Sequence, residues 1–199
     1  MFEFNLEDFN SSKINEVIHF INNKTKELGF DMASRPETGA LLRVLAASKP
    51  NGRFLEIGTG TGLGTAWLLE GMDKNSKLIS IECDKNVQSV AKEAFLNDDR
   101  LELIYDNGSD FLKNQIPNSY DMIFADAYPG KYEFLDETLN LLKPGGIYIV
   151  DDMLPQADWP EDHFPLAKGV LDSLKNLKNV VSVGLNWSSG LIIIVPKRN

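Results

Sequence analysis

The sequence has one cysteine, few basic residues and no long apolar run. One thiol cannot form an intrachain disulfide, so Cys83 excludes a disulfide-stapled fold and suits a reducing compartment. The longest apolar runs, such as residues 191–195, are far shorter than the roughly 20 residues that span a bilayer. Residues 1–10 also lack the basic and then apolar layout of a secretory signal. We therefore expect a soluble, cytoplasmic protein with no membrane partner.

Basic residues are outnumbered, with 20 Lys and Arg against 29 Asp and Glu and a net charge of -9. Nucleic-acid binding draws its affinity from Lys and Arg that displace counterions, so a nucleic-acid partner is disfavoured. A hydrophobic fraction of 43% predicts a packed core. No repeat or linker interrupts the 199 residues. We expect one domain over residues 1–199, with helices over 1–50 and an α/β core over 51–199.

The first 50 residues have helical periodicity. Apolar residues recur at i, i+3, i+4 and i+7 at Ile14, Val17, Ile18 and Ile21. A second helix is predicted over residues 36–48, where Ser34 and Glu37 have the spacing of a capping box. These helices could supply a dimer surface, which leaves a homodimer open.

From residue 53 onward, short apolar runs alternate with helical patterns. Strands are predicted at residues 53–57, 77–81, 101–105, 120–125 and 146–150. Helices are predicted at residues 65–72, after Asp84, through Tyr132, Leu135, Leu139 and Leu142, and at 166–177, with residues 143–146 as a break. Such alternation predicts a parallel sheet with helices on both faces.

The C-terminal segment differs from this alternation. Two further strands, residues 180–185 and 191–195, are joined by only five residues, 186–190. A crossover helix cannot fit in that connection, so the pair is predicted to be an antiparallel hairpin. The fold class is therefore α/β and Rossmann-like, with a mostly parallel seven-stranded sheet that ends in an antiparallel hairpin.

A glycine-rich turn follows the first strand and precedes a helix. Alternating glycines stand at positions 58, 60, 62 and 64, so the backbone can approach a ligand closely. The dinucleotide fingerprint G-x-G-x-x-G/A is absent, because its last position falls on Leu63, Thr65 or Trp67. This spacing disfavours a nicotinamide oxidoreductase, and the alternative to a ligand site is an ordinary tight turn.

The acid at the strand end followed by alternating glycines resembles the first motif of class I S-adenosylmethionine-dependent methyltransferases, whose sheet commonly ends in an antiparallel hairpin. The resemblance implies that Glu56 faces the cationic amino-acid end of the cofactor S-adenosyl-L-methionine. The loop residues implied to hold that cofactor are Gly58, Thr59, Gly60 and Gly62.

Two later segments complete the implied cofactor site. Glu82 ends the second strand, where a carboxylate can accept both ribose hydroxyls, with Cys83 beside the adenine. A solvated surface glutamate is the alternative for Glu82. The adenine contact would come from Gly108, Ser109 and Asp110, although such a run also makes an ordinary turn and helix cap.

Three aspartates follow the ends of two later strands. Asp126 closes the fourth strand, and Asp151 and Asp152 close the fifth, so all three should border one crevice. Asp121 begins its strand and is interpreted as structural. Gathered carboxylates repel one another unless a cation, a proton or hydrogen bonds compensate, and Mg²⁺ or another divalent ion would do so.

The sequence around these aspartates resembles the metal-binding motifs of the catechol and caffeoyl-CoA O-methyltransferase family. The resemblance implies that Asp126, Asp151 and Asp152 hold a metal that binds the acceptor hydroxyl, with Asp126 also at the cofactor and Asp126 and Asp152 in catalysis. The chain departs from the family, because Pro129 stands where those enzymes have a catalytic Lys, the nearest Lys being Lys131. Asp152 also replaces an Asn.

Two further positions bear on function. Gly64 stands where the catechol enzymes have a Ser. His163, near the end of a long loop after the fifth strand, is a candidate general base or an ordinary polar surface residue. His19 on the first helix is interpreted as structural.

The residues together predict an O-methyltransferase acting on a small hydroxylated acceptor by direct displacement at the methyl carbon. An N-methyltransferase and a metal-independent methyltransferase are alternatives within the class. Enzymes that methylate amino groups of nucleic acids or protein amides usually carry an Asn/Asp-Pro-Pro-Tyr type motif, whereas residues 126–129 read Asp-Ala-Tyr-Pro. Remoter alternatives are an NAD-dependent oxidoreductase and a non-catalytic nucleotide-binding module.

Overall fold

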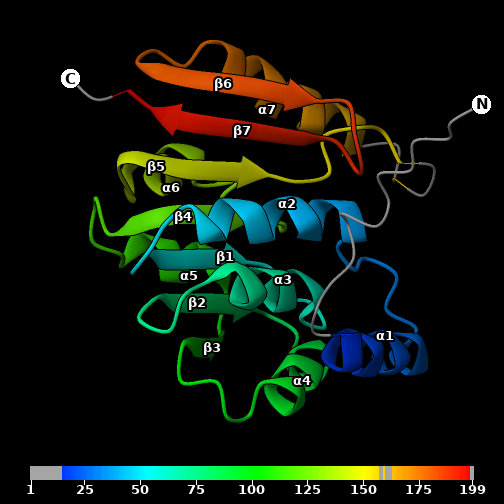
Figure 1. Ribbon diagram of the computed structural model, residues 1–199. Coiled ribbons are helices and arrows are strands. Elements are labelled where there is room, and N and C mark those ends of the chain that lie inside the picture. Colours follow the sequence, from blue (N-terminus) through cyan, green and yellow to red (C-terminus); the bar gives the residue numbers. More distant parts are fainter. Residues whose placement is uncertain (1–14, 157–158, 160–162, 198–199) are drawn as a thin grey trace, which may run out of the picture.

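The computed structural model describes residues 15–156, 159 and 163–197, and Figure 1 shows the arrangement of its elements. The predicted periodicity at Ile14 lies outside the described residues, and the helix there begins at Asn15. The described helices are α1 (Asn15–Leu28), α2 (Pro36–Ala47), α3 (Leu63–Gly71), α4 (Lys85–Ala94), α5 (Gly108–Lys113), α6 (Leu135–Asn140) and α7 (His163–Lys175). The described strands are β1 (Arg53–Ile57), β2 (Lys77–Glu82), β3 (Leu101–Tyr105), β4 (Tyr120–Ala125), β5 (Leu142–Val150), β6 (Val180–Leu185) and β7 (Leu191–Pro196).

The strands form one seven-stranded sheet in the order β3-β2-β1-β4-β5-β7-β6. Strands β1 to β5 pair in parallel, and β7 is antiparallel to both β5 and β6. The predicted fold class is therefore confirmed. The chain reverses its direction of winding between β1 and β4, which is where open α/β sheets bind ligands, at the carboxyl ends of the strands.

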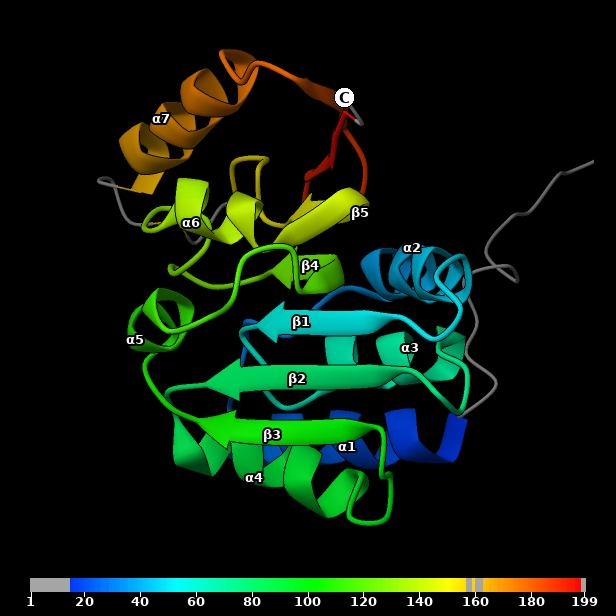
Figure 2. The same cartoon turned by 90° about the vertical axis from the view of Figure 1, so that its left-hand side faces the viewer.

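Helices cover both faces of the sheet. On one face α2 and α3 pack on the sheet, with α1 and α4 beside α3; α5, α6 and α7 lie on the other face (Figures 1 and 2). Alternate residues of β1 serve the two sides, since Phe54 joins the α2 and α3 cluster while Leu55 and Ile57 join the α5 and α7 cluster. This alternation puts Glu56 on the α3 side, under the start of that helix.

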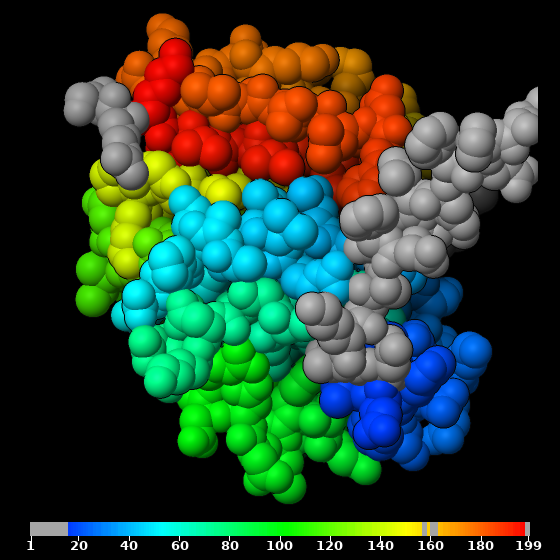
Figure 3. Space-filling model, in the orientation of Figure 1, coloured from blue at the N-terminus to red at the C-terminus, as the bar shows by residue number. Residues whose placement is uncertain are grey.

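The C-terminal hairpin forms one edge of the sheet. In Figure 3, β6 and β7 run side by side along the upper rim above α2. Val181 and Val183 of the edge strand β6 are exposed. Among the described residues, no helix combines the length and apolar character needed to cross a bilayer.

Three local predictions were wrong. The expected capping box at α2 does not form, because Arg35 is the N-cap residue without a side-chain hydrogen bond and Ser34 donates to Asp126 instead. The helix predicted through Tyr132 and Leu142 is only the short α6. Residues 143–146 do not break the chain between a helix and a strand but lie inside β5, whose pairing with β4 is irregular near Tyr120.

Helices α2 and α3 approach each other closely through a glycine. A Cβ added at Gly39 would lie 2.2 Å from an indole carbon of Trp67, which is buried at the interface. By contrast, a Cβ at Gly169 in α7 would have no heavy atom within 4 Å.

We predict that Gly39→Ala lowers the free energy of unfolding by about 1–3 kcal/mol, because the indole must move to admit the methyl group. Gly169→Ala is the matched control and should raise stability by about 0.5–1 kcal/mol, since alanine is the better helix former. Urea denaturation of both variants measures the difference. A Gly39→Ala protein as stable as the parent would show that the two helices are not packed this closely.

Candidate active site

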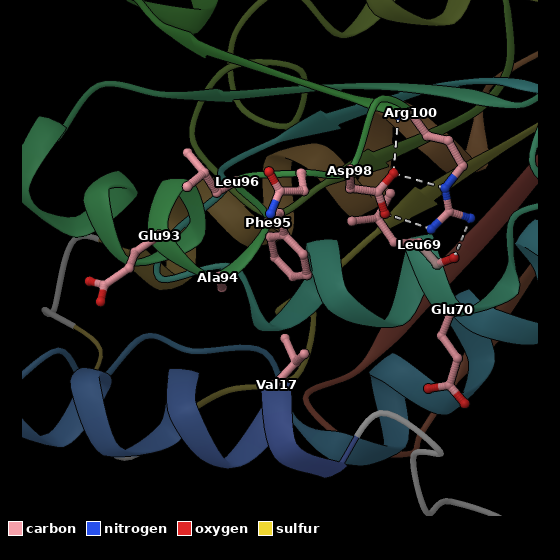
Figure 4. Close-up of a pocket in the computed structure, with 10 residues that line it drawn as sticks. Val17, Leu69, Glu70, Glu93, Ala94, Phe95, Leu96, Asp98 and Arg100 are labelled. Atoms are coloured by element: carbon pink, nitrogen blue, oxygen red, sulfur yellow. Dashed lines mark hydrogen bonds and ion pairs between the residues drawn. The ribbon is translucent and has the colours of Figure 1, made fainter.

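The described part of the chain has cavities at both ends of the sheet. A cavity of about 640 Å³ lies by α1, the end of α3 and the end of α4, next to Asp98 and Arg100 (Figure 4). It is at the amino ends of the strands, and the Arg100 guanidinium already donates to Asp98 and to the carbonyls of Leu69 and Met72. This arrangement is structural, so the candidate site lies at the carboxyl ends.

The glycine turn between β1 and α3 touches the segment after β4. Gly58 has a φ of +99°, and a Cβ there would lie 2.7 Å from the Asp126 carbonyl oxygen. Gly62 has the same φ, and its Cβ would lie 2.8 Å from the Cβ of Ala91 in α4. Only glycine combines this backbone conformation with such close approach.

Thr59 anchors the turn to β2. Its hydroxyl lies 2.7 Å from the Ser80 hydroxyl, and its N–H donates to the Ile81 carbonyl at 3.0 Å. The Thr59 side chain is buried, so its part in any ligand site is to hold the turn rather than to offer its hydroxyl.

Glu56 is the most unusual side chain of this region. It is fully buried, and its Oε2 accepts hydrogen bonds from the hydroxyls of Thr65 and Ser80. Its Oε1 is a buried polar atom that has no hydrogen-bond partner within the described structure. Burial raises the pKa of Glu56 to about 7, against the two hydroxyl hydrogen bonds and with the help of the Glu82 charge.

Gly64 makes room for this carboxylate. A Cβ at position 64 would lie 2.6 Å from Glu56 Oε1 and 3.3 Å from Ser34 Oγ. The Ser expected there by resemblance would therefore crowd Glu56. The nearby hydroxyl is supplied by Ser34, which the sequence pattern assigned to helix capping.

Glu82 faces the glycine turn. Its Oε2 accepts from the Gly60 N–H at 2.9 Å, and its Oε1 accepts from the N–H groups of Cys83 and Asp84 at 2.9 and 3.0 Å. The turn and this carboxylate therefore share one environment, as a common ligand would require. Cys83 is exposed, and partial burial together with the Glu82 charge raises the pKa of its thiol, which disfavours a nucleophilic thiolate.

The segment 108–110 opens α5. The Asn107 side chain caps the helix by accepting from the Ser109 N–H, and Ser109 Oγ donates to Glu133 at 3.0 Å. The Asp110 carboxylate pairs with Lys113 on the exposed surface at 2.9 Å. Gly108 is buried against Pro129, where an added Cβ would have 3.1 Å contacts. The alternative interpretation as a turn and helix cap therefore accounts for the hydrogen bonds seen here.

A second cavity, of about 460 Å³, borders Asp126. We call it the acidic cavity. It is lined by residues 31–35, by the loop after β4 and by the loop after β5, together with Trp159, His163 and Ser189. The three aspartates expected to meet all border it.

The aspartates are tied down by hydroxyl and backbone donors. Asp126 Oδ2 accepts from Ser34 at 2.9 Å, and Asp151 Oδ1 accepts from Ser189 Oγ and from the Asp152 N–H. Burial, followed by the charges of Asp151 and Asp152, raises the pKa of Asp126 well above its usual value. Burial, followed by the Asp152 charge, raises the pKa of Asp151 to about 6.

Lys131 lies inside this group. Its side chain is buried, its Nζ donates to the Asp151 backbone carbonyl at 3.0 Å, and Nζ lies 5.1 Å from the centre of the Tyr132 ring. A tight turn places it, because the N–H groups of Lys131 and Tyr132 both donate to the Tyr128 carbonyl. Pro129, at the position of the family's Lys, packs outside against Gly108.

The expected metal ligands do not form a metal site in this structure. Among residues 15–156, 159 and 163–197, no group of three His, Cys, Asp or Glu side chains is arranged to hold a metal ion. The donor set instead includes the buried ammonium of Lys131, which an oxygen-preferring divalent cation would repel. The divalent cation implied by the resemblance therefore does not fit these residues.

His163 belongs to an aromatic wall of the acidic cavity. Its Nε2 lies 2.8 Å from the Tyr132 hydroxyl, its ring centre is 4.3 Å from that of Trp159, and Tyr128 stacks on Tyr132 at 4.8 Å. Burial, followed by the charges of Asp152 and Tyr128, raises the pKa of Tyr132 to about 12. Sequence reasoning missed Tyr132, whose only signal was its place four residues after Tyr128.

The far side of the cavity is closed by contacts between distant segments. Arg35 donates to the Ser188 carbonyl at 3.1 Å and to the Gln156 side chain at 2.8 Å. Ser189, next to Ser188 in the hairpin turn between β6 and β7, is the buried partner of Asp151. No sequence pattern pointed to Ser189, because its role depends on the hairpin folding back beside β5.

Comparisons with known proteins agree with this geometry. Residues 55–153 match the family described as a methyltransferase domain. A protein named Putative O-methyltransferase from Mycobacterium sp. (strain JLS) is 36% identical over 123 residues, which are 59% of this chain and 56% of that protein. A protein of the same name from Mycolicibacterium vanbaalenii is 37% identical over 123 residues, 59% of this chain and 54% of its own length. The matches thus span little more than half the length of these relatives.

Solved structures share the fold over nearly the whole chain. The O-methyltransferase TomG of Streptomyces achromogenes, in complex with S-adenosylmethionine, has a TM-score of 0.80 at 22% identity, covering 94% of this chain and 92% of its own. The O-methyltransferase of Bacillus cereus, in complex with S-adenosylhomocysteine, has a TM-score of 0.79 at 21% identity, covering 92% and 91%. The chain contains a methyltransferase domain and belongs, by its fold, to the class I S-adenosylmethionine-dependent methyltransferases.

Proposed function

We propose that the protein transfers the methyl group of S-adenosyl-L-methionine to a hydroxyl of a small acceptor. The observation that carries this proposal is the unpartnered Oε1 of buried Glu56 beside a glycine turn that contacts Glu82. A buried carboxylate oxygen without a partner is costly unless a ligand supplies a donor or a positive charge. The methyltransferase family match and the cofactor-bound O-methyltransferases of the same fold support it.

The residues at the carboxyl ends of β1 and β2 fit the cofactor. Glu56 Oε1 would receive the ammonium of its amino-acid end, and the backbone of the turn from Gly58 to Gly62 would approach it closely. Glu82 would exchange one of its present backbone donors for ribose hydroxyls, with Gly108 and Ser109 toward the adenine. When bound, the cofactor supplies a methyl group on a positively charged sulfur.

The acidic cavity is the acceptor site of this proposal. Its volume of about 460 Å³ suits a small molecule, and Tyr128, Tyr132 and Trp159 offer aromatic surface. Asp126 borders both this cavity and the glycine turn, so it would stand between acceptor and cofactor. Its raised pKa makes it a stronger base than an ordinary carboxylate, suited to take the acceptor proton.

Asp152 and His163 complete the proposed catalytic groups. Asp152 borders the cavity with a φ of +56°, a conformation that is unusual for a non-glycine residue. The pair formed by His163 and Tyr132 would orient the acceptor and pass its proton outward. The acidic charge and the single cysteine favour a small-molecule acceptor in the cytoplasm over a nucleic-acid partner.

The cofactor claim predicts that Glu82→Gln weakens binding of S-adenosylhomocysteine about 10–100-fold, because hydrogen bonds to a charged carboxylate are lost. Glu102→Gln on exposed β3 is the matched control and should bind like the parent. Isothermal calorimetry measures both, with NAD as a comparison ligand. Binding of NAD without binding of S-adenosylhomocysteine would overturn the proposal in favour of an oxidoreductase.

The raised pKa of Glu56 predicts pH-dependent binding. Below about pH 7 the free protein holds a proton on Glu56, and a bound ammonium favours the ionised carboxylate, so binding releases that proton. The affinity for S-adenosylhomocysteine should therefore rise about tenfold from pH 6 to its plateau above pH 7. Calorimetry in buffers of different ionisation enthalpy measures the proton. Glu56→Gln should bind weakly and without this dependence, and an unchanged slope in that variant would contradict the assignment.

The catalytic claim predicts that Asp126→Asn lowers kcat about 10²–10⁴-fold on a small phenolic or other hydroxylated acceptor, as expected for the loss of a general base. The matched control is Asp136→Asn on the exposed start of α6. Formation of S-adenosylhomocysteine over a panel of such acceptors gives the rate. Equal rates for the parent and Asp126→Asn would remove Asp126 from the proton transfer.

A further inference from the structure

The acidic cavity contains a positive charge of its own, carried by Lys131. Asp126 and Asp151 are both stabilised in their ionised forms by this ammonium, against the mutual repulsion of the carboxylates. Carboxylates gathered in a partly buried cavity require such a counter-charge. In this chain a side chain of the loop after β4 provides it.

Lys131 is held in place before any ligand binds. About 4% of its surface is exposed, so its charge is not spread into solvent. An ammonium has three donors, and within the described residues Nζ makes one hydrogen bond, to the Asp151 carbonyl. The residue lines the acidic cavity, so two donors are left for an oxygen atom inside it.

The carboxylate oxygens are also partly used. Ser34 donates to Asp126, and Ser189 and the Asp152 N–H donate to Asp151. A hard divalent cation takes about six oxygen ligands, and bringing it into this cavity would place it against a buried ammonium. The arrangement therefore favours the resident lysine over an ion from solution.

We propose that Lys131 replaces the divalent metal of the catechol and caffeoyl-CoA enzymes, and that its ammonium binds the acceptor oxygen in a metal-independent site. This inference rests on the proposed methyl transfer for its catalytic part. The acceptor hydroxyl gives its proton to Asp126, and Lys131 stabilises the resulting oxyanion. The oxygen then forms a bond to the methyl carbon as the carbon–sulfur bond breaks, and its electron pair neutralises the sulfonium.

The first test is binding of Mn²⁺, which needs no methyl transfer. Paramagnetic resonance of free Mn²⁺ should show no site on the parent protein up to about millimolar metal. Lys131→Ala removes the cation and opens space, so it should bind Mn²⁺ at least about tenfold more tightly, and the added change Asp126→Asn should abolish the gain. Lys168→Ala on the exposed face of α7 is the matched control.

A parent site for Mn²⁺ that Asp126→Asn abolishes would overturn the proposal, even if no Lys131 variant folds. A folded Lys131→Ala protein that gains no Mn²⁺ would overturn it equally. Lys131→Met preserves the side-chain length without the charge and serves where alanine unfolds the protein. If S-adenosylhomocysteine does not bind, the proposed function fails, and the Mn²⁺ result stands separately.

The second test is catalytic. Methyl transfer by the parent should be unchanged by exhaustive chelation, and Lys131→Met should lower kcat/KM about 10²–10³-fold while the affinity for S-adenosylhomocysteine stays within about threefold. Lys131→Arg should recover part of the loss because it restores a cation. Loss of activity on chelation, with recovery on adding Mg²⁺, would overturn the proposal.

Discussion

Burial of negative charge at the carboxyl ends of the parallel strands is the constraint on which the site depends. Glu56 at the end of β1 and Asp151 after β5 are buried, and burial raises the pKa of each toward neutrality. Such groups persist in a fold only where donors, cations or ligands compensate them. The structure supplies hydroxyls to both and an ammonium to the aspartates, and it leaves one oxygen of Glu56 without a partner.

The two charged regions adjoin through the segment after β4. The Asp126 N–H donates to the Ile57 carbonyl at 2.9 Å, which continues the pairing of β4 with β1 beyond the strand ends. The Asp151 N–H likewise donates to the Ala125 carbonyl at 3.1 Å. The sheet itself therefore sets the spacing between the glycine turn and the acidic cavity. A methyl donor at the turn and an acceptor in the cavity would meet at Asp126.

The segment before α2 closes this region from the other side. Ser34 reaches Asp126, the Phe30 ring would contact a Cβ at Gly60 at 3.3 Å, and Arg35 reaches Ser188 and Gln156. The N-terminal helices thus contribute to the site as well as to the α3 and α4 face of the sheet. This explains why an apparent capping serine is drawn away from its own helix.

Period-two and period-3.6 hydrophobic patterns, the five-residue connection at 186–190 and the glycine spacing predicted the sheet, the hairpin and the methyltransferase fold from the sequence, because these depend on residues close along the chain. Parallel topology also predicted that Asp126, Asp151 and Asp152 would border one cavity. The tertiary structure alone decided what lies between them. Lys131 enters through a tight turn and Ser189 through a returning hairpin, and the electrostatics of a buried site depend on such contacts between distant segments.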